Sequence, residues 1–194
     1  MKLSSKIALV SAGLALAAIG FSGCTVNINA ADDQNHGMMH QSEASEFSGQ
    51  DIMFAQMMIP HHQQAVDMGT LAETRAEDPE VKALAAQIKS EQAPEIEQMK
   101  AWLDRANAGM DMGHEMGMDG MLSDDEMAAL EKATGTDFDR LYVAGMIAHH
   151  EGAVSMAKMV LNSENAEAKQ LGQAIVESQT KQIETLKAIL KRLG

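Results

Sequence analysis

The sequence predicts an all-α protein in which two copies of a helical hairpin form an antiparallel four-helix bundle. Apolar residues recur at spacings of three and four, no useful stretch alternates with period two, and the pattern is duplicated along the chain. Each hairpin has one apolar stripe, which it can bury only against the other copy. We therefore expect a bundle with pseudo-twofold symmetry and no sheet.

The duplication is clearest in a segment that contains adjacent histidines. Residues 51–68 read DIMFAQMMIPHHQQAVDM, and residues 139–156, which lie 88 positions later, read DRLYVAGMIAHHEGAVSM. Both copies contain the motif Met-x-x-His-His. A capping pattern, Ser-x-x-Asp ending at Asp51 and Thr-x-x-Asp ending at Asp139, opens each expected helix. Because the caps repeat at the same offset as the motif, we interpret the two segments as duplicated first helices.

The second helix of each hairpin is also duplicated. Residues 88–103 and 175–190 align at an offset of 87, and the first of these helices is expected to begin with Asp78 as its N-cap. The equivalent helix of the second copy is expected to begin near Ser163, and a short extra helix, opened by Ser123-x-x-Glu126, to precede that copy. The folded domain, 47–194, divides into a first hairpin at 47–107, a Met-rich loop at 108–122 and a second hairpin at 123–194.

The start of the chain is typical of a bacterial export signal. Lys2 and Lys6 flank an apolar run, residues 7–21, that is too short and too rich in Gly and Ala for a membrane span. The run leads into Phe-Ser-Gly-Cys, which resembles a lipoprotein signal with Cys24 as the lipidated first residue of the mature protein.

The interpretation of the first residues as a lipoprotein signal predicts where the protein resides. Residues 1–23 would be removed, residues 24–46 would form a flexible tether, and the protein would be exported and lipid-anchored to the membrane, at the outer face of the cytoplasmic membrane. Cleavage near Ala30 would instead leave a soluble secreted or periplasmic protein.

The charge and cysteine content of the chain limit the kinds of partner and metal site that we expect. The formal net charge is −13, and removal of Lys2 and Lys6 with the signal makes it −13 − 2 = −15. We therefore expect no nucleic acid partner and a preference for cations. Cys24 is the only cysteine, so disulfides and thiolate metal sites are excluded if it carries lipid.

The histidine pairs are the main candidate site. At about 100° per residue, His61 and His62 lie at about −60° and +40° from Met58, so both face the core stripe, with Met58 between them one turn earlier. The second copy repeats this arrangement with Met146, His149 and His150. Four buried imidazoles without partners are costly, and a metal ion would satisfy several ring nitrogens at once. Three further methionines of these helices are candidate ligands: Met57, Met68 and Met156.

The alternative is a hydrogen-bonded polar layer without metal. Gln92 and Gln179 interrupt the apolar stripes at equivalent places and could complete such a layer. The same two glutamines could instead orient imidazoles that bind a metal.

Two methionine-rich segments without helical periodicity also indicate metal binding. Glycine and aspartate would spoil a helix there, so core packing does not explain their methionines, and the remaining alternative is low-complexity drift. Thioether sulfur prefers Cu(I) or Ag(I), whereas imidazole also accepts Cu(II) and Zn(II). The candidate ligands are His36, Met38, Met39 and His40 in the tether, and Met110, Met112, His114, Met116, Met118 and Met121 in the loop.

The paired motif resembles family 305 of the domains of unknown function over residues from about 47 to 193. MMIPHHQQAV, MIAHHEGAV and helices like IEQMKAWL carry this resemblance. It implies a four-helix, ferritin-like arrangement and, for the copper-binding members, extracytoplasmic metal tolerance. Carried over by position, it marks Met58, His61, His62, Met146, His149 and His150.

These observations favour a non-enzymatic, extracytoplasmic protein that binds copper, as Cu(I) or Cu(II), or silver, for sequestration, resistance or homeostasis. An extracytoplasmic copper-handling protein would be its partner. A ferritin-like oxidase is one alternative, although such centres use Glu-x-x-His pairs and the repeats contain none. An interaction module with a purely structural histidine layer is the other.

Overall fold

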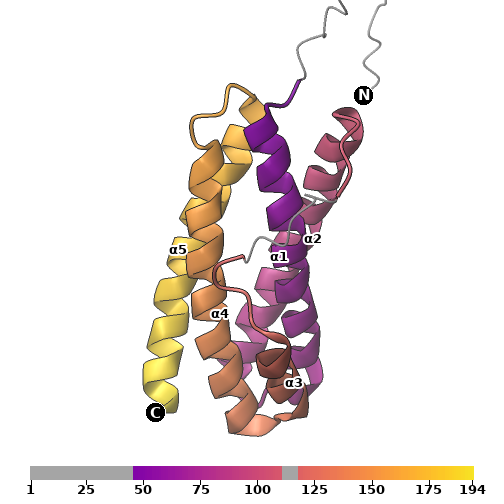
Figure 1. Ribbon diagram of the computed structural model, residues 1–194. Coiled ribbons are helices and arrows are strands. Elements are labelled where there is room, and N and C mark those ends of the chain that lie inside the picture. Colours follow the sequence, from indigo (N-terminus) through magenta and orange to yellow (C-terminus); the bar gives the residue numbers. More distant parts are fainter. Residues whose placement is uncertain (1–45, 111–117) are drawn as a thin grey trace, which may run out of the picture. The chain divides into compact units, whose positions relative to one another are not determined.

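The computed structural model describes residues 46–110 and 118–194, and these residues form helices and no strand. The elements are α1 (Gly49–Arg75), α2 (Pro79–Arg105), α3 (Asp124–Lys132), α4 (Gly135–Ala157), the 3₁₀ turn η1 (Lys158–Val160) and α5 (Ala166–Leu193). In Figure 1, α1 and α4 lie side by side, α2 packs on α1, and α5 packs on α4. The predicted all-α fold, with two duplicated hairpins and a short extra helix, is confirmed.

The helix starts follow the predicted caps with one exception. Ser48 and Asp51 form the expected capping box of α1, and Asp78 caps α2. The start of α5 lies within two residues of the predicted position near Ser163, where Asn165 is the N-cap and accepts from two backbone N–H groups.

Asp139 differs from its predicted role. The cap of α4 is Thr134, which makes no side-chain capping bond, so a capping box ending at Asp139 is wrong. The buried Asp139 carboxylate instead accepts the backbone N–H groups of Glu77 and Asp78, at 3.2 and 2.8 Å. Asp139 therefore ties the α1–α2 turn of the first hairpin to α4 of the second.

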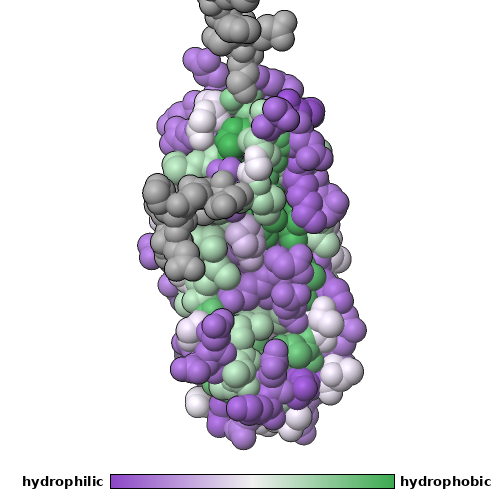
Figure 2. Space-filling view, turned by 45° about the vertical axis from the view of Figure 1, so that its right-hand side comes forward, coloured by the Kyte–Doolittle hydropathy of each residue, from purple (hydrophilic) through white to green (hydrophobic). Residues whose placement is uncertain are grey.

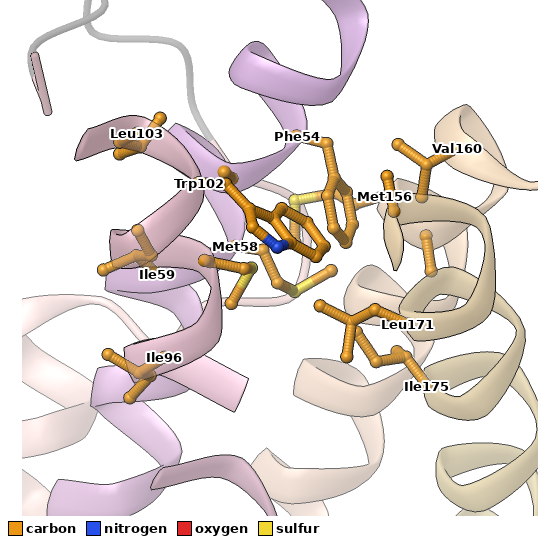
Figure 3. Packing of buried hydrophobic residues seen from close by; sticks show 14 of the residues in the cluster. Phe54, Met58, Ile59, Ile96, Trp102, Leu103, Met156, Val160, Leu171 and Ile175 are labelled. Atoms are coloured by element: carbon orange, nitrogen blue, oxygen red, sulfur yellow. The ribbon is translucent and has the colours of Figure 1, made fainter. Parts of the chain in front are cut away.

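The apolar core has two parts, at opposite ends of the helices. The Trp102 cluster contains Phe47, Phe54, Ala55, Met58, Ile59, Ile96, Met99, Trp102, Leu103, Ala153, Met156, Ala157, Val160, Ala168, Leu171 and Ile175. The Phe138 cluster contains Ala65, Met68, Ala72, Ala76, Val81, Leu84, Ala85, Ile88, Leu130, Phe138, Tyr142, Val143, Met146, Leu186 and Ile189. Figure 3 shows the first cluster, where Trp102, Phe54 and Met58 meet side chains from the second hairpin.

A buried polar layer separates the two clusters. Every one of the four long helices carries members of one cluster, then buried polar residues, then members of the other cluster. The layer consists of His61, His62, Gln92, His149, His150, Gln179 and Gln182. The duplicated motif therefore lies near the middle of the bundle, where α1 and α4 pack together.

The surface is that of amphipathic helices. Hydrophilic side chains predominate on the face shown in Figure 2, with hydrophobic side chains in strips between them. Within the described ranges, no helix is long and apolar enough to cross a membrane.

Candidate metal site

The four histidines of the duplicated motif come together in the polar layer, as the sequence predicts. All four are fully buried. The rings of His61 and His149 are in contact across the α1–α4 interface, with centroids 3.7 Å apart. Ring centroids within each pair are 6.5 Å apart for His61 and His62, and 6.2 Å apart for His149 and His150.

Three of these imidazoles use only one ring nitrogen. The Nε2 atom of His149 lies 2.9 Å from the backbone oxygen of His61. In His62 and His150, Nε2 lies 2.7 Å from Glu95 Oε2 and 2.8 Å from Gln182 Oε1. The Nδ1 atoms of all three residues are buried without a partner among the described residues, and neither ring nitrogen of His61 has one.

The electrostatics favour neutral rings. Burial, assisted by the neighbouring His62, lowers the pKa of His61 to about 3. Burial also lowers the pKa of His150 to about 4. Burial and the neighbouring imidazoles of His61 and His150 together lower the pKa of His149 well below its usual value. These three imidazoles are therefore neutral near pH 7, and a neutral imidazole has one nitrogen lone pair that can accept a proton or a metal.

The buried ring nitrogens are chemically suited to bind a metal ion, but they are not arranged as a preformed metal site. Buried, unpartnered nitrogens are the atoms that a bound cation would satisfy. Among residues 46–110 and 118–194, however, no three side chains of the types His, Cys, Asp and Glu are arranged to hold one ion. A site in this layer would therefore use fewer imidazoles, a thioether, or small rotations of the rings.

The motif methionines are buried but do not gather in one cluster. Met58 lies with Met156 in the Trp102 cluster, whereas Met146 lies with Met68 in the Phe138 cluster. The two motif methionines therefore lie on opposite sides of the histidine layer. An antiparallel pairing of α1 and α4 exchanges the two ends, so each cluster receives one motif methionine. Met57 is partly buried and packs against the Trp102 cluster.

The predicted role of Gln92 and Gln179 also needs correction. Both are buried in the layer, but Gln92 makes no side-chain hydrogen bond in the described part of the chain, and the side-chain oxygen of Gln179 makes none. His62 and His150 instead hydrogen-bond Glu95 and Gln182, which lie one helical turn after Gln92 and Gln179. A signal for these residues was present, because Glu95 and Gln182 are themselves equivalent at the offset of 87.

The described ends of the Met-rich loop are fixed beside the layer. The side chain of Gln56 donates to the backbone oxygen of Gly109 at 2.6 Å. The amide of Gln64 donates to the Leu122 oxygen at 2.9 Å and accepts from its N–H at 2.8 Å. Gln56 and Gln64 lie on either side of the histidine pair of α1, so both ends of the loop lie near the candidate site.

Close contact between the backbone of the loop and α4 explains why residue 152 is a glycine. Gly152 is equivalent to Gln64, and a Cβ atom at Gly152 would lie 1.9 Å from the backbone oxygen of Asp119. Gly120, with a φ of +88°, packs in turn against the backbone of Ala148. The end of the loop thus packs on α4 directly beside His149.

The loop methionines that the structure describes differ in exposure. Met110 is 49% exposed, and Met118 packs against the Trp102 cluster. Met121 lines a cavity of about 300 Å³ between α3 and α4. The remaining candidates lie outside the described residues: Cys24, His36, Met38, Met39, His40, Met112, His114 and Met116.

Comparison with known proteins identifies the family. The model of the family described as "Domain of unknown function (DUF305)" matches residues 51–190, which include α2, α4 and most of α1 and α5. The chain belongs to the DUF305 family. The resemblance seen in the paired motif is therefore confirmed. No match is found among curated proteins.

Solved DUF305 structures share the fold. A protein from Streptomyces coelicolor, described as a secreted DUF305 protein, is 34% identical with a TM-score of 0.70; the match covers 78% of this chain and 96% of that one. A DUF305 fragment from Deinococcus radiodurans is 30% identical with a TM-score of 0.69, covering 75% and 98%. The Cu(II)-bound form of CopM is 36% identical with a TM-score of 0.62, covering 74% and 97%. CopM has also been solved in Cu(I)-bound and Ag-bound forms.

Proposed function

We propose that this DUF305 protein binds copper as cargo outside the cytoplasm, with Ag(I) as the equivalent soft ion. The observation that carries the proposal is the set of buried, unpartnered ring nitrogens on His61, His62, His149 and His150. A buried polar atom without a partner is destabilising by about 1–3 kcal/mol, so several of them in one layer require an explanation. A bound cation would satisfy them.

Ligand chemistry supports copper over harder metals. Neutral imidazole and thioether are the donors that Cu(I) accepts, and buried methionines lie on both sides of the layer. CopM is a relative of this chain, and its structures with bound Cu(I), Cu(II) and silver support the proposal that this protein binds copper. In this proposal Cu(I) is the main cargo, Cu(II) is held through imidazole alone, and the loop methionines capture the ion first.

The proposed setting is the outer face of the cytoplasmic membrane. The lipoprotein-like signal ending at Cys24 and the description of a relative as secreted support export. The protein would sequester copper or pass it to another extracytoplasmic copper-handling protein. Its net negative charge would attract the cation.

A competition titration with a chromogenic Cu(I) chelator tests the proposal. We expect the protein to remove Cu(I) from the chelator, and expect this uptake to fall when the four histidines are replaced by leucine and residues 110–121 are deleted. No uptake by the unmodified protein, or uptake unchanged in that variant, would refute copper binding at these sites. We propose binding without catalysis; sustained oxygen consumption with Cu(I) as substrate would instead indicate an oxidase.

A further inference from the structure

Two of the buried imidazoles are connected to carboxylates on α2. The Nε2 atom of His62 lies 2.7 Å from Glu95 Oε2. An ionised carboxylate can only accept, so Nε2 of His62 carries the proton and donates it to this bond. An imidazole that carries its single proton on Nε2 has its lone pair on Nδ1, and the Nδ1 atom of His62 is buried without a partner.

The second connection runs through an amide. Gln182 Nε2 donates to Glu91 Oε2 at 2.7 Å. Because the carboxylate accepts only, this bond fixes which end of the amide faces Glu91, and the amide oxygen faces His150 at 2.8 Å. His150 must therefore also donate from Nε2, which leaves its unpartnered Nδ1 with the lone pair.

The two chains are related by the duplication, yet they are not equal. Glu95 and Gln182 lie at equivalent positions, so the first copy uses a charged acceptor where the second uses a neutral one. Both chains nevertheless end in carboxylates of α2, one turn apart. Glu91 and Glu95 also line a groove of about 420 Å³ between α2 and α5, so the chains lead from the buried layer to solvent.

We propose that Glu95, and Glu91 acting through Gln182, are positioning residues that lock His62 and His150 in the Nε2–H tautomer and leave the Nδ1 lone pair of each ring available to a bound cation. This inference rests on the proposed copper binding. A carboxylate on the far nitrogen makes an imidazole a stronger ligand, and such outer partners typically change metal affinity by about 10- to 100-fold. Because only His62 bonds a carboxylate directly, the first copy supplies the stronger ligand.

The tautomers can be measured without any metal. Two-dimensional ¹H–¹⁵N spectra of the ¹⁵N-histidine-labelled, metal-free protein distinguish protonated from unprotonated ring nitrogens, with assignment by single His→Gln variants. We expect His62 and His150 to be protonated at Nε2. Glu95→Ala should mix the tautomers of His62 alone, whereas Glu95→Gln should keep the Nε2–H form because its amide oxygen can still accept.

The more demanding variant is Glu91→Ala, since Glu91 does not contact an imidazole in the described structure. Loss of the carboxylate should let the Gln182 amide flip and should mix the tautomers of His150. Glu97→Ala is the matched control on the same helix; Glu97 pairs with Lys100 at the surface, and we expect no change. An unmixed His150 in Glu91→Ala, or an unmixed His62 in Glu95→Ala, would overturn the assignment.

A second arm separates this inference from the proposed function. With the chromogenic Cu(I) chelator, Glu95→Ala should weaken Cu(I) binding by about 10- to 100-fold, and Glu97→Ala should leave it unchanged. Mixed tautomers with unchanged Cu(I) affinity would refute positioning while copper binding stands. Absence of Cu(I) binding in the unmodified protein would instead refute the proposed function itself, whatever the tautomers are.

Discussion

Lowering the pH from 7 to 5 should destabilise the metal-free protein strongly, because the buried histidines resist protonation. Burial lowers the pKa of His61 from 6.5 to about 3 and that of His150 to about 4, and it also lowers the pKa of His149. Below pH 6.5 the unfolded chain therefore binds protons that the native protein does not. The free energy of unfolding must then fall as the pH falls.

The size of the effect follows from these shifts. A histidine with a pKa of 6.5 in the unfolded chain and a native pKa below 5 makes unfolding about 2 kcal/mol easier at pH 5 than at pH 7. His61 and His150 together therefore give about 4 kcal/mol, which is close to the lower end of the total stability of a typical domain, about 5–15 kcal/mol, and His149 acts in the same direction. Carboxylates whose pKa is lowered, such as Glu126 and Glu167, lose their contribution only at lower pH, below this window.

Urea unfolding followed by circular dichroism, at pH 7 and pH 5 with a copper chelator present, measures this difference. His61→Leu is the matched variant, and it should reduce the loss of stability by about 2 kcal/mol. Equal stability of the unmodified protein at the two pH values would refute the assignment of neutral, buried imidazoles. An unchanged pH dependence in His61→Leu would refute the contribution of that residue.

Three further predictions concern single residues. At pH 7, His61→Leu should stabilise the metal-free protein by about 1–3 kcal/mol in urea unfolding, since it removes two unpartnered ring nitrogens; a loss of stability would contradict this. Gly152→Ala should cost about 1–3 kcal/mol because the new Cβ overlaps the Asp119 oxygen, whereas Gly49→Ala, where nothing lies within 4 Å, should cost none. Cys24→Ser should move the protein from the membrane fraction to the soluble fraction of the producing cells, and unchanged membrane association would argue against lipidation.

Much of the fold could be predicted from the sequence because the helical hairpin is duplicated along the chain. Repeats at offsets of 88 and 87 gave the two hairpins, and the helical angle of the motif placed all four imidazoles in the core. Local signals also worked where the contact is local, as in the capping box of Ser48 and Asp51. The same kind of signal failed at Asp139, because its carboxylate bonds a turn 61 residues away, and local patterns contain no information on such contacts.

The details of the site depend on how the hairpins pair. Antiparallel packing of α1 and α4 places Met58 and Met146 in different clusters, on opposite sides of the histidine layer, and the helical angles of one helix contain no information on this pairing. Gln92 and Gln179 were the visible polar interruptions of apolar stripes. Their neighbours Glu95 and Gln182 make the bonds instead, because side-chain length and direction, and not position on the stripe, decide which atoms meet.

The most direct test of the buried layer as the copper site is anaerobic titration of the ¹⁵N-histidine-labelled protein with Cu(I), which is diamagnetic and leaves ring nitrogen signals observable. We expect the Nδ1 signals of layer histidines such as His62 and His150 to shift as the first equivalent binds, while their Nε2 signals stay those of protonated nitrogens. Binding that shifts only His36, His40 and His114, with the four layer histidines unchanged, would contradict a buried copper site.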